Sequence, residues 1–387
     1  MSDLKALLKS CATCMPSKHT YRKLITFRSA KAYKRCLRQL KELGIKPFKT
    51  VSRCRIIGCH FHKSISWHDL ANHPQVKLIE KDFKIRAHGV ITKRKRIKLK
   101  GRSIPLLTPA TTPALLTWNI SRIKAPEAWA TTRGKSIKVA IIDSGIASHP
   151  DLRIAGGINT INGGSYADDN GHGTHVAGIL AAAGKSGKVT GTAPEISLYA
   201  VKALDLYGDG FVSDIVDGIN WCITNKMQVI NMSFGILDSN NSGTLHDAIK
   251  RAAKQGIVMV ASAGNSGKSS KQIDVPASFK ETIAVAASTK ANKVAGFSSR
   301  GRGIGLTAPG DSILSTWLNG KYMTLSGTSM ASPHVAGGAA LLLAGKPGIS
   351  ARAIKKRLRL RAFKLKKFKS RSQGAGLLQL DRIFKNI

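Results

Sequence analysis

The hydrophobic pattern divides the chain into a small N-terminal part and a large C-terminal part. From about residue 118 onward, apolar runs typical of buried strands alternate with runs typical of helices. The pattern predicts strands at 137–142, 196–201, 228–232, 257–262 and 282–286, and helices at 172–183, 212–223, 244–254 and 329–344. This alternation favours an α/β fold in which helices cover both faces of a mostly parallel sheet.

Residues 20–88 have the pattern of a separate, small α+β unit. The longer of its two predicted helices places Tyr33, Leu37 and Leu40 on one face and ends at Gly44. Residues 1–19 are expected to form an N-terminal tail. The pattern predicts strands at 21–27, 51–61 and 76–85, and helices at 30–43 and 67–72.

A serine in the last third of the chain has the surroundings of an acyl-transfer nucleophile. A turn of small residues, 326–328, places Ser329 directly before an apolar run, 331–343, that predicts a buried helix. A serine at such a strand-to-helix turn can expose its hydroxyl, and it lies beside helix N–H groups that favour developing negative charge. Because a serine hydroxyl is unreactive by itself, this interpretation needs a base and an orienting carboxylate elsewhere.

Two other segments supply these partners. The predicted strand 137–142 ends in Asp143 and a glycine turn, and a carboxylate at such a strand end is a usual site position in α/β folds. His172 lies between glycines at a predicted helix start. Each residue alone has a structural alternative, such as a turn or helix cap for Asp143. The chain order Asp, His, Ser is the order found in subtilisin.

The motifs around Asp143, His172 and Ser329 resemble those of subtilisin-like serine peptidases (subtilases), and the resemblance covers residues 118–380. It implies a three-layer sandwich with a mostly parallel central sheet, preceded by a small α+β propeptide domain. It also implies that Ser329 attacks the substrate, that His172 acts as base and that Asp143 orients the imidazole. Asn265 would stabilise the oxyanion, together with the backbone N–H of Ser329.

The resemblance extends to the N-terminal unit. Residues 70–82 are similar to the closing segment of the subtilase propeptide, which implies a folding template and intramolecular inhibitor; an independent binding domain is the alternative. Residues 89–113 contain a basic run and three prolines, so they are expected to form an extended linker that holds the maturation site. The catalytic domain would span 114–387, with a basic C-terminal segment at 352–387.

By position in the family, two edge segments are expected to pair with an extended substrate. Asp274 departs from the family pattern, because it aligns with a position that is often small, at the base of the pocket for the residue before the scissile bond (P1). A carboxylate there would favour Lys or Arg at P1; the alternative is a solvent-facing Asp. The expected edge segments are Gly208, Asp209 and Gly210, and Ser233, Phe234 and Gly235; the expected pocket residues are Ser262, Ala263 and Gly264.

The net charge of +41 is concentrated on the two flanks. Residues 1–112 hold 27 Lys and Arg against 5 Asp and Glu, and residues 352–387 hold 13 against 1. The stretch between them, 113–351, carries a net charge of only +7. This distribution favours an anionic surface or a nucleic acid as an accessory partner of the flanks, although no nucleic-acid recognition motif is visible.

No cofactor is required by the predicted chemistry, and no metal ligand set is assigned. The calcium site of the family looks lost: Asp151 matches a ligand, but Lys185 and Ala114 replace the usual asparagine and glutamine. Lys185 cannot coordinate Ca²⁺ and is expected to pair with Asp151 instead. The six cysteines are expected to be free thiols; Cys11 and Cys14, together with Cys59 and His62, offer a zinc site as the alternative.

The sequence therefore predicts a monomeric serine endopeptidase that works through an acyl-enzyme, matures by self-cleavage and favours basic P1 residues. The alternative is a catalytically silent regulatory or scaffold homologue that binds peptides or polyanions. No run of 18 apolar residues predicts a membrane span. The start shows no secretion signal, which favours a cytoplasmic or spore-associated protein, with secretion as the alternative.

Overall fold

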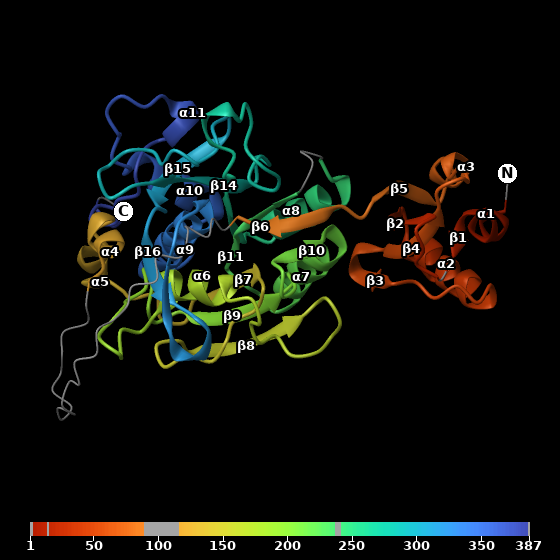
Figure 1. Ribbon diagram of the computed structural model, residues 1–387, viewed down its shortest axis with the longest axis horizontal. Coiled ribbons are helices and arrows are strands. Elements are labelled where there is room, and N and C mark those ends of the chain that lie inside the picture. Colours follow the sequence, from red (N-terminus) through yellow and green to blue (C-terminus); the bar gives the residue numbers. More distant parts are fainter. Residues whose placement is uncertain (1–2, 14, 89–115, 237–240, 386–387) are drawn as a thin grey trace.

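The structure of the protein is a computed structural model that describes residues 3–13, 15–88, 116–236 and 241–385. Figure 1 shows these residues as two units placed along the long axis of the molecule. The N-terminal unit ends at residue 88, and the C-terminal unit begins at residue 116. The predicted linker 89–113, with its expected maturation site, lies outside the described residues.

A parallel sheet forms the centre of the C-terminal unit. Its order is β15-β14-β13-β11-β7-β9-β8, and every neighbouring pair is parallel. All five strands that the sequence predicted belong to this sheet. The strands are β7 (Lys138–Asp143), β8 (Ile154–Asn159), β9 (Ser197–Lys202), β11 (Val229–Met232), β13 (Val258–Ser262), β14 (Thr282–Ser288) and β15 (Ile304–Pro309).

Helices cover both faces of this sheet. Successive side chains of a strand point to opposite faces of the sheet. Val139 and Ile141 pack in one core with α6 and α9, whereas Ala140 and Ile142 pack in another with α7 and α8. Strands buried on both faces are apolar throughout, which explains the short apolar runs in the sequence. The expected three-layer α/β sandwich is confirmed. The covering helices are α6 (His172–Ala181), α7 (Val212–Thr224), α8 (Gly243–Lys254) and α9 (Thr328–Gly345).

The sequence pattern missed the two edge strands of the sheet. β8 contains Gly156 and Gly157, and β15 contains Gly305 and Pro309, so neither shows a continuous apolar run. Pairing with β9 and β14 holds these strands in place. The unit also contains α4 (Trp118–Arg122), α5 (Ala125–Trp129), β16 (Ile313–Thr316), β17 (Tyr322–Leu325), α10 (Ala351–Leu360), α11 (Ser370–Gln373) and 3-10 helices at 267–269 and 318–320.

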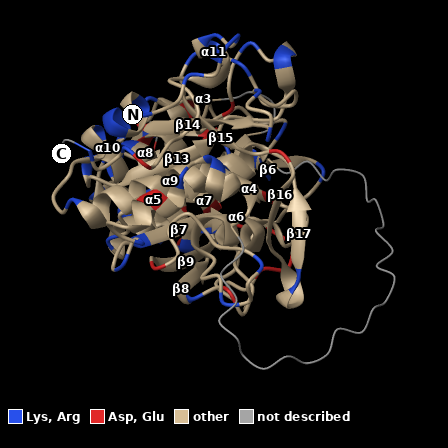
Figure 2. Cartoon of the chain, turned by 90° about the vertical axis from the view of Figure 1, so that its left-hand side faces the viewer, with Lys and Arg blue, Asp and Glu red and all other residues tan. Residues whose placement is uncertain are grey.

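The basic C-terminal segment is partly built into the core. Ile354 and Leu358 of α10 are fully buried. The helix ends at Leu360, so the basic residues of 361–369 lie on irregular chain, where Lys364 and Lys366 are exposed. Figure 2 shows Lys and Arg on the segments around α10 and α11.

The N-terminal unit is an antiparallel sheet covered by helices on one face. The sheet order is β1-β4-β2-β5, and β3 pairs with β4. Residues expected to form an N-terminal tail instead form α1 and β1, and Leu4, Leu8 and Cys11 are buried in the core of the unit. The elements are α1 (Leu4–Cys11), β1 (Ala12–Thr13), β2 (Thr20–Phe27), α2 (Ala30–Glu42), β3 (Lys49–Val51), a 3-10 helix at 52–54, β4 (Ile56–His62), α3 (His68–Ala71) and β5 (Val76–Lys81).

The last strand predicted for the N-terminal unit, 76–85, is split in two. Its first part, β5, stays in the sheet of the N-terminal unit, but β6 (Lys84–Ala87) leaves that sheet. β6 pairs in antiparallel fashion with β10 (Asp209–Phe211) and β12 (Phe234–Ile236) of the C-terminal unit. Figure 1 shows β6 extending from one unit to the other.

Charged residues fix the N-terminal unit on the starts of α7 and α8. The Glu80 carboxylate accepts hydrogen bonds from the backbone N–H of Gly243 at 2.9 Å and of Thr244 at 3.1 Å. Asp82 accepts from the backbone N–H of Ser213 at 2.9 Å. Each carboxylate thus satisfies free N–H groups at a helix N-terminus and lies at the positive end of the helix dipole.

Candidate active site

The ends of β7 and the start of α6 bring Asp143 and His172 together. Nδ1 of His172 lies 2.7 Å from Oδ1 of Asp143, and both side chains are buried. The backbone N–H of Ser144 donates to the same carboxylate oxygen at 2.8 Å. These bonds fix the imidazole so that Nε2 is the ring nitrogen left for other chemistry, and Nε2 has no hydrogen-bond partner among the described residues.

The electrostatics of this pair suit a base. Burial opposes the charged imidazole, but the charge and hydrogen bond of Asp143 outweigh it, and the pKa of His172 lies above its ordinary value. His175, three residues later, is a packing residue: its Nε2 lies 2.9 Å from the carbonyl oxygen of Met323, and burial lowers its pKa to about 3.

Asp168 stabilises the loop that carries His172. One of its carboxylate oxygens accepts from the Ser144 hydroxyl at 2.9 Å and from the backbone N–H of Gly171 at 2.9 Å. The other accepts from the backbone N–H of Thr174 at 2.9 Å. The base and the orienting carboxylate are therefore held by one buried network.

Ser329 lies in the first turn of α9 and is buried. Its hydroxyl donates to the carbonyl oxygen of Ser233 at 2.9 Å, and the described residues show no hydrogen bond between Ser329 and His172. The same carbonyl of Ser233 accepts from the backbone N–H of His88 at 3.1 Å. Ser329 and the end of the N-terminal unit therefore share a partner.

Asn265 faces the last described residue of the N-terminal unit. Its side-chain Nδ2 donates to the carbonyl oxygen of His88 at 2.7 Å. Its Oδ1 accepts from the backbone N–H of Thr328 at 3.0 Å and from the Thr328 hydroxyl at 2.9 Å, which fixes the orientation of the amide. A Cβ on Gly327 would lie 2.5 Å from the same His88 oxygen, so only glycine leaves room for that carbonyl.

The predicted edge segments lie on either side of β6. Arg86 pairs with Asp209 of β10 on one side and with Gly235 of β12 on the other. The backbone N–H of Ala87 donates to the carbonyl oxygen of Gly208 at 3.0 Å. The Arg86 side chain binds the Asp209 carboxylate through two hydrogen bonds, of 2.6 and 2.8 Å. In the same strand pairing, Gly210 of β10 lies opposite Ile85 and Phe234 of β12 lies opposite Ala87.

The His88 side chain enters a pocket formed by residues predicted to bind P1. Its Nδ1 lies 2.7 Å from the Ser262 hydroxyl, and its Nε2 lies 2.8 Å from the Asp274 carboxylate. The Asp274 side chain is 28% exposed and faces the histidine. A Cβ on Gly264 would lie 2.5 Å from that carboxylate. Ala263 accepts from the Asp274 N–H at 3.0 Å, which joins the two pocket segments.

Sequence reasoning missed His88 as a residue of the site. The residue follows a predicted strand of an ordinary small domain and precedes the linker, and no local motif surrounds it. The only available signal was indirect: residue 88 closes the unit that resembles an inhibitor. Its position depends on β6 leaving its own sheet, which hydrophobic periodicity does not encode.

The environment of Asp151 corrects one prediction. Lys185 is exposed and makes no ion pair with Asp151 in the described part of the chain. Asp151 instead accepts from the backbone N–H of Ser186 at 2.8 Å, from the Ser186 hydroxyl and from Oη of Tyr322 at 2.7 Å. Burial opposes its ionisation, but these bonds hold the pKa of Asp151 below its ordinary value. The Asp151 carboxylate is thus surrounded by hydrogen-bond donors. Ca²⁺ needs several oxygen ligands around it, so this arrangement does not fit a calcium site.

Other metal and membrane features are judged over the described ranges only. Within them, no cluster of three or more His, Cys, Asp or Glu residues has the arrangement of a metal site. Cys11 and Cys59 of the zinc alternative are buried free thiols, and Cys14 lies outside the described residues. Across the same ranges, no helix combines the length and the apolar character needed to cross a bilayer.

Comparison with known families gives a match over most of the C-terminal unit. The subtilase family matches residues 134–377, which include Asp143, His172, Asn265 and Ser329. The match covers well over half of the chain. The region that matches the family therefore contains the four residues whose geometry is described above.

Three curated proteins illustrate the similarity. The minor extracellular protease Epr of Bacillus subtilis is 47% identical over 227 residues, which cover 58% of this chain and only 35% of Epr. A thermostable alkaline protease of Halalkalibacterium halodurans is 43% identical over 277 residues, 70% of this chain and 76% of that protein. Subtilisin DY of Bacillus licheniformis is 47% identical over 246 residues, 62% of this chain and 89% of subtilisin DY.

Proposed function

The chain belongs to the subtilase family of serine endopeptidases, and we propose that it hydrolyses peptide bonds through Ser329, His172 and Asp143. Oγ of Ser329 bonds to the carbonyl carbon of the substrate while Nε2 of His172 takes its proton. His172 then gives that proton to the leaving amine, and the C–N bond breaks to leave an acyl-enzyme. A water molecule then attacks the acyl-enzyme in the same way, with His172 taking its proton and returning it to Oγ of Ser329, which releases the carboxylic acid and restores the serine.

The observation that carries the proposal is the hydrogen bond between Asn265 and the carbonyl of His88. A donor placed at 2.7 Å from a peptide carbonyl, beside the start of α9, is the arrangement that stabilises an oxyanion. Ser329 takes its reactive position by exchanging its bond to Ser233 for one to Nε2 of His172, the nitrogen without a partner in the described structure.

The N-terminal unit acts as the inhibitor of this peptidase in our proposal. β6 occupies the place of a substrate strand, between the two edges that would hold one. The carbonyl that meets Asn265 belongs to His88, so the bond between residues 88 and 89 is the proposed maturation site. After cleavage, the strand would remain in the cleft as a bound product and would leave more slowly than the bond breaks.

The pocket around Asp274 supports a preference for basic P1 residues. His88 presents one ring nitrogen to Asp274 and the other to Ser262, so a cationic side chain meets both a carboxylate and a hydroxyl there. We propose that substrates with His, Lys or Arg at P1 are cleaved in preference to those with large apolar side chains.

A fluorophosphonate label tests the catalytic assignment. The full chain is incubated to allow its own cleavage and is then labelled, and the labelled peptide is identified by mass spectrometry. We expect one label, on Ser329, and none in the Ser329→Ala chain. Ser288→Ala is the matched control, because Ser288 is a buried serine whose hydroxyl has no partner among the described residues. Absence of both label and peptide hydrolysis would instead favour the catalytically silent homologue.

A further inference from the structure

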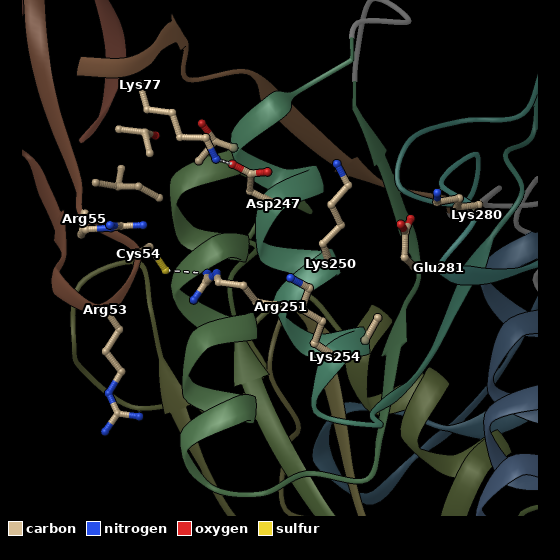
Figure 3. Close-up of a pocket in the computed structure, with 14 residues that line it drawn as sticks. Arg53, Cys54, Arg55, Lys77, Asp247, Lys250, Arg251, Lys254, Lys280 and Glu281 are labelled. Atoms are coloured by element: carbon tan, nitrogen blue, oxygen red, sulfur yellow. Dashed lines mark hydrogen bonds and ion pairs between the residues drawn. The ribbon is translucent and has the colours of Figure 1, made fainter. Parts of the chain in front are cut away.

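A cavity lies between the two units, away from the cleft. Its volume is about 640 Å³. One wall comes from the N-terminal unit, around the 3-10 helix 52–54 and β5, and the other comes mainly from α8 (Figure 3). No group that the proposed peptidase chemistry uses lines this cavity, so its residues need a separate explanation.

The cavity is strongly cationic. Seven Lys and Arg residues line it, against two acidic residues. Both acids are already engaged: Asp247 pairs with Lys77, and Glu281 lies 3.1 Å from Nε2 of His246. The cationic residues are Arg53, Arg55 and Lys77 from the N-terminal unit and Lys250, Arg251, Lys254 and Lys280 from the C-terminal unit.

Cations of both units line this cavity, and of the seven only Lys77 has an ion pair among the described residues. Figure 3 shows Arg53 and Arg55 on one side and Arg251 on the other. Arg251 donates to Sγ of Cys54 at 2.7 Å, and burial raises the pKa of that thiol, so its partner is uncharged at neutral pH. Like charges brought together at an interface raise its electrostatic free energy unless an anion lies between them.

Two buried hydroxyls, one in each wall of the cavity, also lack partners. Thr26 of β2 is 6% exposed and Thr244 of α8 is 2% exposed, and both line the cavity. Neither hydroxyl oxygen has a hydrogen-bond partner among the described residues. Buried hydroxyls are normally hydrogen-bonded, so these two oxygens are unused hydrogen-bonding capacity in the residues that line the cavity.

We propose that this cavity binds a compact ligand with several phosphate groups, such as a short polyphosphate, and that the ligand holds the N-terminal unit on the peptidase. Lys and Arg supply charge-assisted hydrogen bonds to phosphate oxygens, and the two walls supply them from opposite sides. Because the complete site exists only while the units are together, the ligand stabilises the associated state by mass action. The regulatory part rests on the proposed function; the binding part does not.

Binding is tested on the full chain carrying Ser329→Ala, which keeps both units joined. Sodium tripolyphosphate is titrated by calorimetry at constant ionic strength. We expect one saturable site, weakened at least tenfold by Lys250→Gln with Lys254→Gln. The matched control is Lys364→Gln with Lys366→Gln, two exposed lysines of the basic C-terminal segment, which should leave the affinity unchanged. Absence of saturable binding, or equal weakening by both pairs, overturns the proposal.

The regulatory step has its own readout. In the chain with Ser329 intact, tripolyphosphate should lengthen the delay between self-cleavage, followed on a gel, and the appearance of activity on a peptide. The delay should not change in the variant with Lys250→Gln and Lys254→Gln. An equal delay in both chains contradicts the regulatory role. A chain that binds tripolyphosphate but never cleaves itself would refute the proposed peptidase function and leave the binding site standing.

Discussion

The two ends of the interface between the units differ in how far their charges are balanced within the protein. At the end formed by the cleft and the starts of α7 and α8, the charged groups that hold the N-terminal unit meet opposite charges or helix N–H groups. Lys49 lies 2.9 Å from Asp214, Arg22 lies 2.8 Å from Asp82, and Glu80 caps α8. At the cavity end, Lys77 pairs with Asp247, but the other six lining cations have no ion pair among the described residues.

We propose that the paired end holds the N-terminal unit in place and that the cavity end regulates how long it stays bound. The paired end needs nothing else to hold the N-terminal unit in place, because each desolvated charge has its partner within the protein. The cavity end leaves charge uncompensated, so its contribution to the association depends on what the solution supplies. The comparison predicts large effects of substitutions at the cleft and at the paired end, and small effects at the cavity end when no anion is present.

The largest effect is expected at the oxyanion donor. Asn265→Ala should lower kcat on a peptide substrate by about 10²–10³, the magnitude seen for the corresponding loss in subtilisin itself, because the developing charge loses a hydrogen bond. KM should change little. Asn220→Ala, on α7, serves as the control. A loss of less than threefold in kcat of the Asn265 variant would remove Asn265 from the site.

A smaller effect is expected at the paired end of the interface. Lys49→Gln leaves the buried Asp214 without its cation, and this should shorten the delay between self-cleavage and activity by about 10²-fold. Lys254→Gln, at the cavity end, should leave that delay within about twofold in phosphate-free buffer, since an exposed lysine contributes little. Equal effects of the two substitutions would contradict the comparison.

The P1 pocket should respond more weakly still. Peptides that differ only in P1 are compared, with His, Lys or Phe at that position. Asp274→Asn should reduce the proposed preference for His and Lys over Phe by about tenfold, because the ion pair lies in a partly exposed pocket. Glu127→Gln, an exposed change on α5, is the control. A preference that stays the same in the Asp274 variant would assign P1 selection to other residues.

The pH dependence of self-cleavage gives the finest test of the cleft. His172 acts as base only when neutral, so the rate falls as pH drops through its pKa. Burial lowers that pKa, but Asp143 raises it by more, so the acid limb should lie above the ordinary histidine value of 6.5. Measured in the full chain, a limb below 6.5 would contradict the Asp143–His172 geometry.

Local motifs were enough to predict the residues of the proposed chemistry. Asp143, His172, Asn265 and Ser329 each lie at a strand end or helix start, where turn chemistry and hydrophobic pattern coincide in a few consecutive residues. The seven-stranded core followed for the same reason, apart from β8 and β15, whose glycines and proline interrupt the apolar runs.

Features that depend on contacts between distant segments could not be predicted in the same way. His88 enters the pocket only because β6 pairs with two strands that begin more than a hundred residues later. The expected pair of Lys185 and Asp151 was wrong, because the hydroxyls of Ser186 and Tyr322 reach that carboxylate instead. The interdomain cavity is likewise invisible in the sequence, where its two walls are about 200 residues apart.

The most direct test of cleavage by Ser329 between residues 88 and 89 is the N-terminus of the protein after self-cleavage. The full chain and its Ser329→Ala variant are produced identically, incubated and analysed by intact mass and N-terminal sequencing. We expect the wild-type chain to be cut once, giving a C-terminal fragment that begins at Gly89, and the variant to stay intact. A wild-type chain that stays whole, a first cut elsewhere, or the same cut in the Ser329→Ala variant would contradict this expectation.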